Sequence, residues 1–171
     1  MILNMKNNIR LFLFVIMTLF LLSSCAGGAF HLRQSTRLSG VYVKIALEGI
    51  SKESALYTTL EQALIEAKGE VVTLSEADSI LSIDQLKEDK KIVAYTSARI
   101  AREYMIYLNF DYEIKVVGKK PQKRSIRLNK TLIYDSTFVL GKAEEEHRIQ
   151  QSLREEAARL ILLHLQYIGA H

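Results

Sequence analysis

The sequence predicts an α+β fold, a two-layer sandwich in which two helices pack against a mainly antiparallel sheet of about four strands. Three observations support this class. One long stretch alternates apolar and polar residues, two segments repeat apolar residues at helical spacing, and the order is strand, helix, several strands, final helix. No internal repeat or low-complexity segment interrupts this order, so we expect a single domain.

The first strand and the first helix follow one another after residue 40. Apolar residues alternate over residues 41–46, as in a strand, and the spacing becomes helical from Ser54 to Lys68. The expected helical stripe is Leu56, Leu60, Ala63, Leu64 and Ala67. Gly69 stands where a helix commonly ends in the left-handed conformation.

The middle of the chain supplies most of the predicted sheet. Val71–Leu74 predicts a short extension, and the mixed face of Ile80–Leu86 favours an edge strand. Glu103–Val117 is the clearest strand, because seven of its residues form one apolar face. These are Tyr104, Ile106, Leu108, Phe110, Tyr112, Ile114 and Val116. The opposite face is polar, as in an antiparallel sheet covered on one side only, and a hairpin tip at Gly118–Arg124 leads to the strand Ser125–Tyr134.

A long final helix is expected from about Ala143 to Ile168. Three glutamates, at positions 144–146, would lie in its first turn, where the helix dipole favours acids. Its stripe is Ile149, Leu153, Ala157 and Leu160. Beyond Leu160 the helix is apolar almost all round, and this surplus either lies deep in the core or meets another protein.

The first 24 residues have the pattern of an export signal. Lys6 and Arg10 precede the apolar run Leu11–Leu22, which is too short to span a bilayer needing about 20 apolar residues. The sequence Leu22-Ser23-Ser24-Cys25 resembles the lipobox of bacterial lipoproteins. That resemblance implies cleavage before Cys25, which then carries S-diacylglycerol and N-acyl groups, whereas the alternative for this residue is an idle or buried thiol.

These observations divide the chain into residues 1–24 as signal peptide, 25–40 as lipid-anchored tether and 41–171 as one α+β domain. By resemblance to sorted bacterial lipoproteins, Ala26 after the cysteine implies the outer membrane. Removing 24 of the 171 residues leaves 147, enough for one core, and lowers the net charge from +4 to +2. A domain so close to neutral lacks the basic footprint of a nucleic-acid binder.

The residues offer no catalytic or metal-binding constellation. The four histidines show no metal-ligand spacing, and neither a nucleophile elbow nor a phosphate-binding glycine loop is present. Cys25 is the single cysteine, so a thiol nucleophile is excluded once it is acylated. Asp111 and Glu113 lie on the polar face of a strand, where acids are usually solvated. We therefore expect a protein that is not an enzyme and has no metal or cofactor besides the acyl groups.

Without a catalytic constellation, the expected function is binding, and the candidate binding residues are basic. The cluster Lys119–Arg124 either meets phosphate groups or is simply a solvated hairpin tip. Arg99 and Arg102 precede the long strand, and Lys142 lies at a turn ahead of the last helix. Each of these could pair with anionic lipid headgroups.

Several of these features together resemble the LptE family of outer-membrane lipopolysaccharide-assembly lipoproteins. They are the lipobox followed by Phe30-His31-Leu32-Arg33, the short strand and helix ending at Gly69, the Glu103-Tyr104 start of the long strand, and Leu140-Gly141-Lys142 before an acidic helix start. The resemblance implies a plug in the lumen of the LptD β-barrel, which it helps to assemble, and contact with lipopolysaccharide during insertion into the outer leaflet. It also implies lipopolysaccharide-binding roles for Lys142 and for Arg99 or Arg102.

Two other functions remain open from the sequence. One is a lipid-anchored subunit of another envelope lipid transporter that touches a soluble partner. The other is a structural envelope lipoprotein that grips peptidoglycan.

Overall fold

The structure is a computed structural model that describes Leu38, residues 43–134 and residues 139–169. The chain divides into two compact units, residues 1–34 and 35–171, of which the first lies wholly outside the described residues. The predicted signal peptide, Cys25 and the Phe30-His31-Leu32-Arg33 motif therefore lie outside the described residues, and the description below concerns the second unit.

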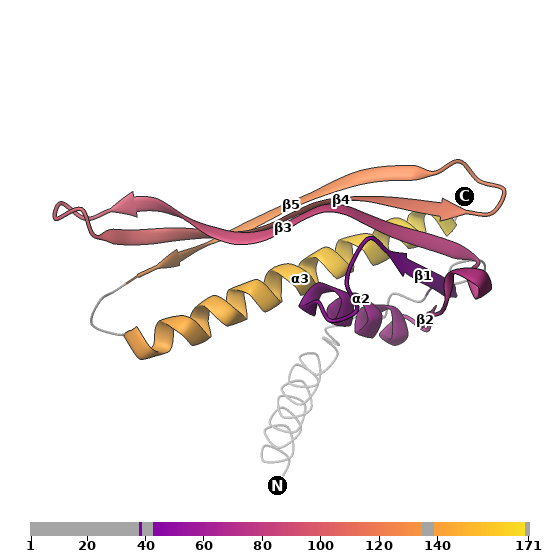
Figure 1. Ribbon diagram of the computed structural model, residues 1–171, viewed down its shortest axis with the longest axis horizontal. Helices are drawn as coiled ribbons and strands as arrows, with labels where there is room; N and C mark the ends of the chain where they lie inside the picture. The colour runs from indigo at the N-terminus through magenta and orange to yellow at the C-terminus, as the bar shows by residue number, and fades with distance from the viewer. Residues whose placement is uncertain (1–37, 39–42, 135–138, 170–171) are drawn as a thin grey trace, which may run out of the picture. The chain divides into compact units, whose positions relative to one another are not determined.

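Five strands form one mixed sheet in the order β2-β1-β3-β4-β5 (Figure 1). They are β1 (Lys44–Glu48), β2 (Glu70–Val71), β3 (Ser79–Tyr95), β4 (Ala101–Val116) and β5 (Gln122–Ile133). β1 is parallel to both β2 and β3, whereas β3, β4 and β5 are antiparallel. The α+β class is confirmed, but the sheet has one strand more than expected and two of its pairings are parallel.

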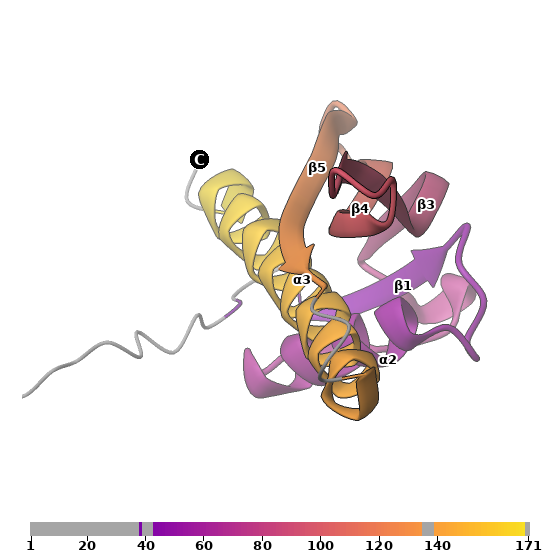
Figure 2. The same ribbon diagram turned by 90° about the vertical axis from the view of Figure 1, so that its left-hand side faces the viewer.

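Two helices, α2 (Ala55–Glu66) and α3 (Val139–Gly169), lie on the same side of the sheet (Figure 2). A short 3-10 helix, η2 (Leu74–Glu76), follows β2. The buried side chains of the two helices and of the facing side of the sheet form a single hydrophobic cluster. This is the expected two-layer arrangement, with the other side of the sheet left uncovered by either helix.

The ends of α2 follow from its capping residues. The hydroxyl of Ser54 accepts a hydrogen bond of 3.1 Å from the backbone N–H of Tyr57, which satisfies one of the free donors of the first turn. At the other end Lys68 has a φ of 67°, and the N–H of Gly69 donates to the carbonyl of Leu64. The left-handed residue is thus Lys68 and not Gly69. Gly69 is required for space, because a Cβ there would lie 3.0 Å from the Leu38 side chain.

β4 confirms the clearest sequence pattern. Its apolar face is buried from Ile106 to Val116, and Phe110 is fully buried at the centre of the core. Tyr104, at the start of the strand, is partly buried and packs against the same core. This strict alternation works because β4 has a paired strand on each side and helices over only one face.

β3 departs from the prediction in length and position. It runs 17 residues instead of seven and lies between β1 and β4, so the expectation of an edge strand was wrong for its first half. A bulge between Asp84 and Lys87 adds one residue, and Gln85 takes a φ of 52° there. Because one extra residue reverses the alternation, Glu88 and Lys90 face α3 with the apolar residues of β4.

α3 also begins earlier than predicted. It starts at Val139, so the glutamates at 144–146 are not in its first turn. Gly141 does not delay the helix, because one glycine costs only about 1 kcal/mol in a helix that gains far more by packing. The apolar surplus after Leu160 is mostly core: Ile161, Leu162 and Leu165 are buried. Leu163 and Tyr167 are exceptions, with 44% and 62% of their surfaces exposed.

Candidate functional site

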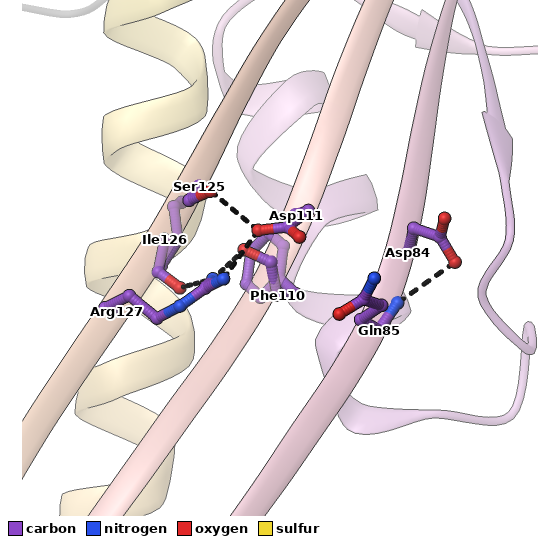
Figure 3. A network of polar contacts seen from close by, with 7 residues as sticks. All are labelled: Asp84, Gln85, Phe110, Asp111, Ser125, Ile126 and Arg127. Atoms are coloured by element: carbon purple, nitrogen blue, oxygen red, sulfur yellow. Dashed lines mark hydrogen bonds and ion pairs between the residues drawn. The ribbon is translucent and has the colours of Figure 1, made fainter.

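The sheet presents an uncovered polar face, which we call the open face, made by the outward side chains of β3, β4 and β5. Its central contact is between Asp111 and Arg127, 2.7 Å apart, and the hydroxyl of Ser125 donates to the same carboxylate oxygen at 2.6 Å (Figure 3). The pKa of Asp111 is lowered first by the hydrogen bond from Ser125 and then by that from Arg127. Asp111 is therefore held as a carboxylate.

The guanidinium of Arg127 is fixed by backbone as well. It donates to the carbonyls of Phe110 and Ile126 at 2.7 and 2.8 Å (Figure 3). Across the sheet Asp84 lies opposite Asp111 in the β3–β4 register, and its carboxylate accepts from the N–H of Gln85 at 3.1 Å. These contacts order the charges of the open face.

The second acid predicted on this face is paired in the same way. Glu113 lies 3.2 Å from Lys115 and 3.7 Å from Lys123. The expectation that Asp111 and Glu113 belong to a solvated face is confirmed, and no described group of three or more acids, histidines or cysteines could hold a metal ion. The open face is therefore suited to polar contact.

The basic cluster at residues 119–124 does not form one site. Lys119 donates to the carbonyl of Ile168 at 3.1 Å, and Lys123 pairs with Glu113 on the open face. Arg124 lies opposite Tyr112 and faces α3. Because β5 already begins at Gln122, Lys123 and Arg124 point to opposite sides of the sheet.

Arg99 and Arg102 lie at the opposite end of β4. Arg99 is in the turn between β3 and β4, with a φ of 61°, and its N–H donates to the carbonyl of Thr96 at 2.9 Å. Arg102 is inside β4, where its carbonyl accepts from the N–H of Tyr134 at 2.7 Å. The expectation that both precede the strand was wrong for Arg102, since pairing with β3 starts the strand at Ala101. Both side chains are exposed.

Lys142 lies in the first turn of α3 and not before the helix. Its side chain is only 18% exposed, and its ammonium lies 2.7 Å from the carboxylate of Glu145. Lys142 is therefore a partly covered, paired charge and not a freely exposed one. The pairing follows from the early helix start, which places the two residues three positions apart on one face.

Two cations that the sequence analysis missed lie next to this pair. Lys130 and Arg148 line a cavity of about 320 Å³ between β5 and the first half of α3, and Glu145 lines it too. Lys142 itself does not line this cavity, but its partner Glu145 does, so Lys142 lies at the edge of a cavity that contains two further cations. Arg99 and Arg102 do not line the cavity. A signal for Lys130 was present: it is in phase with Ile126 and Leu132 on the inward face of β5.

The histidines do not alter this picture. His164 is buried and hydrogen-bonded to Tyr112, while His147 is exposed on α3. Within the described residues, no helix combines the length and the apolar character needed to cross a bilayer. The candidate site thus consists of the open face and the cationic cavity beside α3.

Comparison with known proteins gives a family and a fold. The model of the LptE family, described as lipopolysaccharide-assembly, matches residues 41–165. No curated protein sequence matches the chain.

Several solved structures share the fold. One is lipoprotein B from Nitrosomonas europaea, 19% identical with a TM-score of 0.64 over 75% of this chain and 84% of that one. Another is rare lipoprotein B from Shewanella oneidensis, 16% identical with a TM-score of 0.64 over 74% and 96%. A minor lipoprotein from Acinetobacter baumannii is 18% identical, with a TM-score of 0.61 over 77% and 96%.

Proposed function

Because the chain belongs to the LptE lipopolysaccharide-assembly family, we propose that it is a non-enzymatic lipoprotein that plugs an LptD-type β-barrel, helps to assemble it and binds lipopolysaccharide for insertion into the outer leaflet. It works at the periplasmic side of the outer membrane, anchored by diacylglycerol and an amide-linked acyl chain on Cys25. The support for the anchor is the sequence Leu22-Ser23-Ser24-Cys25, and Ala26 supports the outer membrane.

The observation that carries the barrel contact is the open face. Three long strands leave one side of the sheet without a helix, and ion pairs across neighbouring strands, Asp111–Arg127 and Glu113–Lys123, hold its charges in place. A preorganised polar surface loses little side-chain freedom on docking, which favours binding to a polar partner surface such as the lumen of a barrel. The open face is therefore the surface that we assign to the barrel.

The cationic cavity supports the lipopolysaccharide contact. Lys130 and Arg148 line it and Lys142 is held at its edge, so several cations are available to anionic groups of the glycolipid. Arg99 and Arg102, exposed at the β3–β4 turn and the start of β4, offer a second basic surface. We assign the tighter contact to the cavity, because its cations are partly preorganised.

Cross-linking tests the barrel contact. A photoreactive amino acid at Asn109, on the open face of β4, is expected to give adducts with a co-expressed LptD-type barrel in intact membranes. A sample without irradiation is the control. Adducts with a soluble transporter subunit or with peptidoglycan instead would favour the two alternative functions, and recovery of free monomer alone from mildly solubilised membranes would contradict the barrel contact.

Capture of lipopolysaccharide tests the cavity. Lys130→Gln and Lys142→Gln should each weaken capture about fivefold, the scale of a partly exposed ion pair. Lys52→Gln, an exposed residue before α2, is the matched control and should leave capture unchanged. Glutamine is used at position 142 because aspartate would face Glu145 and disturb the helix. Equal capture by all three variants would remove the cavity from the proposal.

A further inference from the structure

A second cavity lies between β5 and the last turns of α3. Its volume is about 400 Å³, and its apolar walls are Ile126, Leu160, Leu163 and Tyr167. We call it the C-terminal groove. It shares no lining residue with the cationic cavity, and along α3 Leu160 follows Ser152, the last residue that lines that cavity, by eight residues, or about 12 Å at 1.5 Å per residue.

One cation, Arg124, stands at this groove. It lies opposite Tyr112 in the β4–β5 register, so its side chain faces α3, and it forms no ion pair with any described residue. Its neighbour Lys123 faces the open side of the sheet and pairs with Glu113. Arg124 is thus a positive charge beside an apolar wall, and no acidic side chain of the described residues pairs with it.

Two polar groups among the lining residues satisfy each other. The hydroxyl of Tyr112 and Nδ1 of His164 are hydrogen-bonded at 2.9 Å. Burial lowers the pKa of His164, and Arg124 lowers it further, so the imidazole is neutral at pH 7. Arg124 is therefore the one charged side chain among the residues that line the groove.

We propose that the C-terminal groove binds a single-chain aliphatic carboxylate, with the alkyl chain against Leu160 and Leu163 and the carboxylate paired with Arg124. The volume lies at the lower end of the range for small-ligand sites. One guanidinium matches one carboxylate in a bidentate pair, and an exposed leucine beside it gains by being covered. This inference does not depend on the barrel or on lipopolysaccharide.

Photo-labelling tests the groove in the full chain as the cell produces it, held in phosphatidylcholine nanodiscs. The probe is palmitate with a diazirine in its chain, and adducts are mapped by mass spectrometry. We expect saturable labelling of Leu160 and Leu163 that laurate displaces and dodecanol displaces at least tenfold less well. Labelling that does not saturate, or equal displacement by both competitors, overturns the proposal.

Three variants assign the result to the groove. Arg124→Gln should lower labelling about tenfold, and Leu163→Trp, which fills the groove from an exposed position, should abolish it. Lys123→Gln removes the same charge from the opposite face and should have no effect. Undiminished labelling of Arg124→Gln excludes the carboxylate pairing. Concentration-dependent dimerisation that Leu163→Trp removes would instead show that a second copy covers the groove, and would also overturn the proposal. Unfolding midpoints identify any variant that fails to fold.

Discussion

The hydroxyl oxygen of Tyr112 lies 2.9 Å from Nδ1 of His164, and this hydrogen bond between two buried side chains joins β4 to α3. The two rings also meet edge to face, with centroids 5.7 Å apart. The pair thus fixes the last turns of α3 against the sheet. It also places a titratable group inside the core.

The burial of His164 predicts that the free energy of unfolding decreases as the pH is lowered below neutrality. The folded-state pKa lies below the ordinary value of 6.5, first because burial disfavours the imidazolium and second because Arg124 is positive. The unfolded chain therefore binds the proton at higher pH than the folded chain. Stability is at its full value above about pH 6.5 and is lost as the pH falls from there through the folded pKa. Urea unfolding at several pH values between about 7.5 and 5.5 measures this.

Two histidine variants on one helix separate this effect from other titrations. In His164→Asn the extra pH dependence should disappear. In His147→Asn, which changes an exposed histidine of α3, it should persist. A pH dependence that survives in His164→Asn would show that another group is responsible.

A second prediction concerns the contact between the bulged half of β3 and α3. Glu88 and Arg154 form two hydrogen bonds, of 2.6 and 3.1 Å, with side chains only 22% and 12% exposed. Arg154→Met keeps much of the apolar stem but leaves Glu88 without its partner, so we expect a loss of about 1–3 kcal/mol in unfolding free energy.

The control lies one turn further along α3. Arg159 and Glu156 are 3.9 Å apart with side chains 59% and 40% exposed, so Arg159→Met should cost less than about 0.5 kcal/mol. Equal losses for the two variants would contradict a special role for the Glu88–Arg154 pair. A double variant with Glu88→Gln then measures the coupling directly.

The bulge in β3 gives a third prediction. Gln85 has a φ of 52°, a conformation that asparagine tolerates and β-branched residues avoid. Gln85→Val should therefore cost about 1–2 kcal/mol, whereas Gln85→Asn should stay within about 0.5 kcal/mol. Lys87→Val, after the bulge and exposed, is the control in ordinary strand backbone. If Gln85→Val were tolerated as well as Lys87→Val, the bulge would not have the geometry described.

This bulge also explains why the sequence predicted some elements and not others. β4 has no bulge within its apolar face, so its alternation identified every core residue that it supplies. In β3 the alternation reverses after Gln85, and two charged residues, Glu88 and Lys90, occupy inward positions because α3 supplies partners. No local pattern can reveal partners that lie more than 50 residues away.

The sequence likewise predicted some residues of the candidate site but not the contacts that they make. Lys142, Arg99 and Arg102 were candidates as basic residues near turns and by resemblance, but the pairing of Lys142 with Glu145 needed the helix start, which Gly141 concealed. Lys130 and Arg124 occupy the inward phase of β5, where a cation is unexpected, and each lines one of the two cavities against α3. The sequence shows that both cations occupy inward positions of the strand. Only the position of α3 shows why cations are tolerated there.

Two glycines with positive φ give the last prediction. Gly49, after β1, has a φ of 74°, and a Cβ there would lie 2.0 Å from the carbonyl oxygen of Ile83. Gly118, between β4 and β5, has a φ of 78° with no atom within 4 Å of such a Cβ. Gly118→Ala therefore costs only the backbone strain, about 1 kcal/mol, whereas Gly49→Ala adds a clash with a strand and should cost about 3 kcal/mol or more. Thermal unfolding measures the stability of the two variants, which are matched because both replace glycine by alanine. Similar losses would mean that β3 can move away from Gly49, and the close approach of β1 to β3 would not be a constraint on the fold.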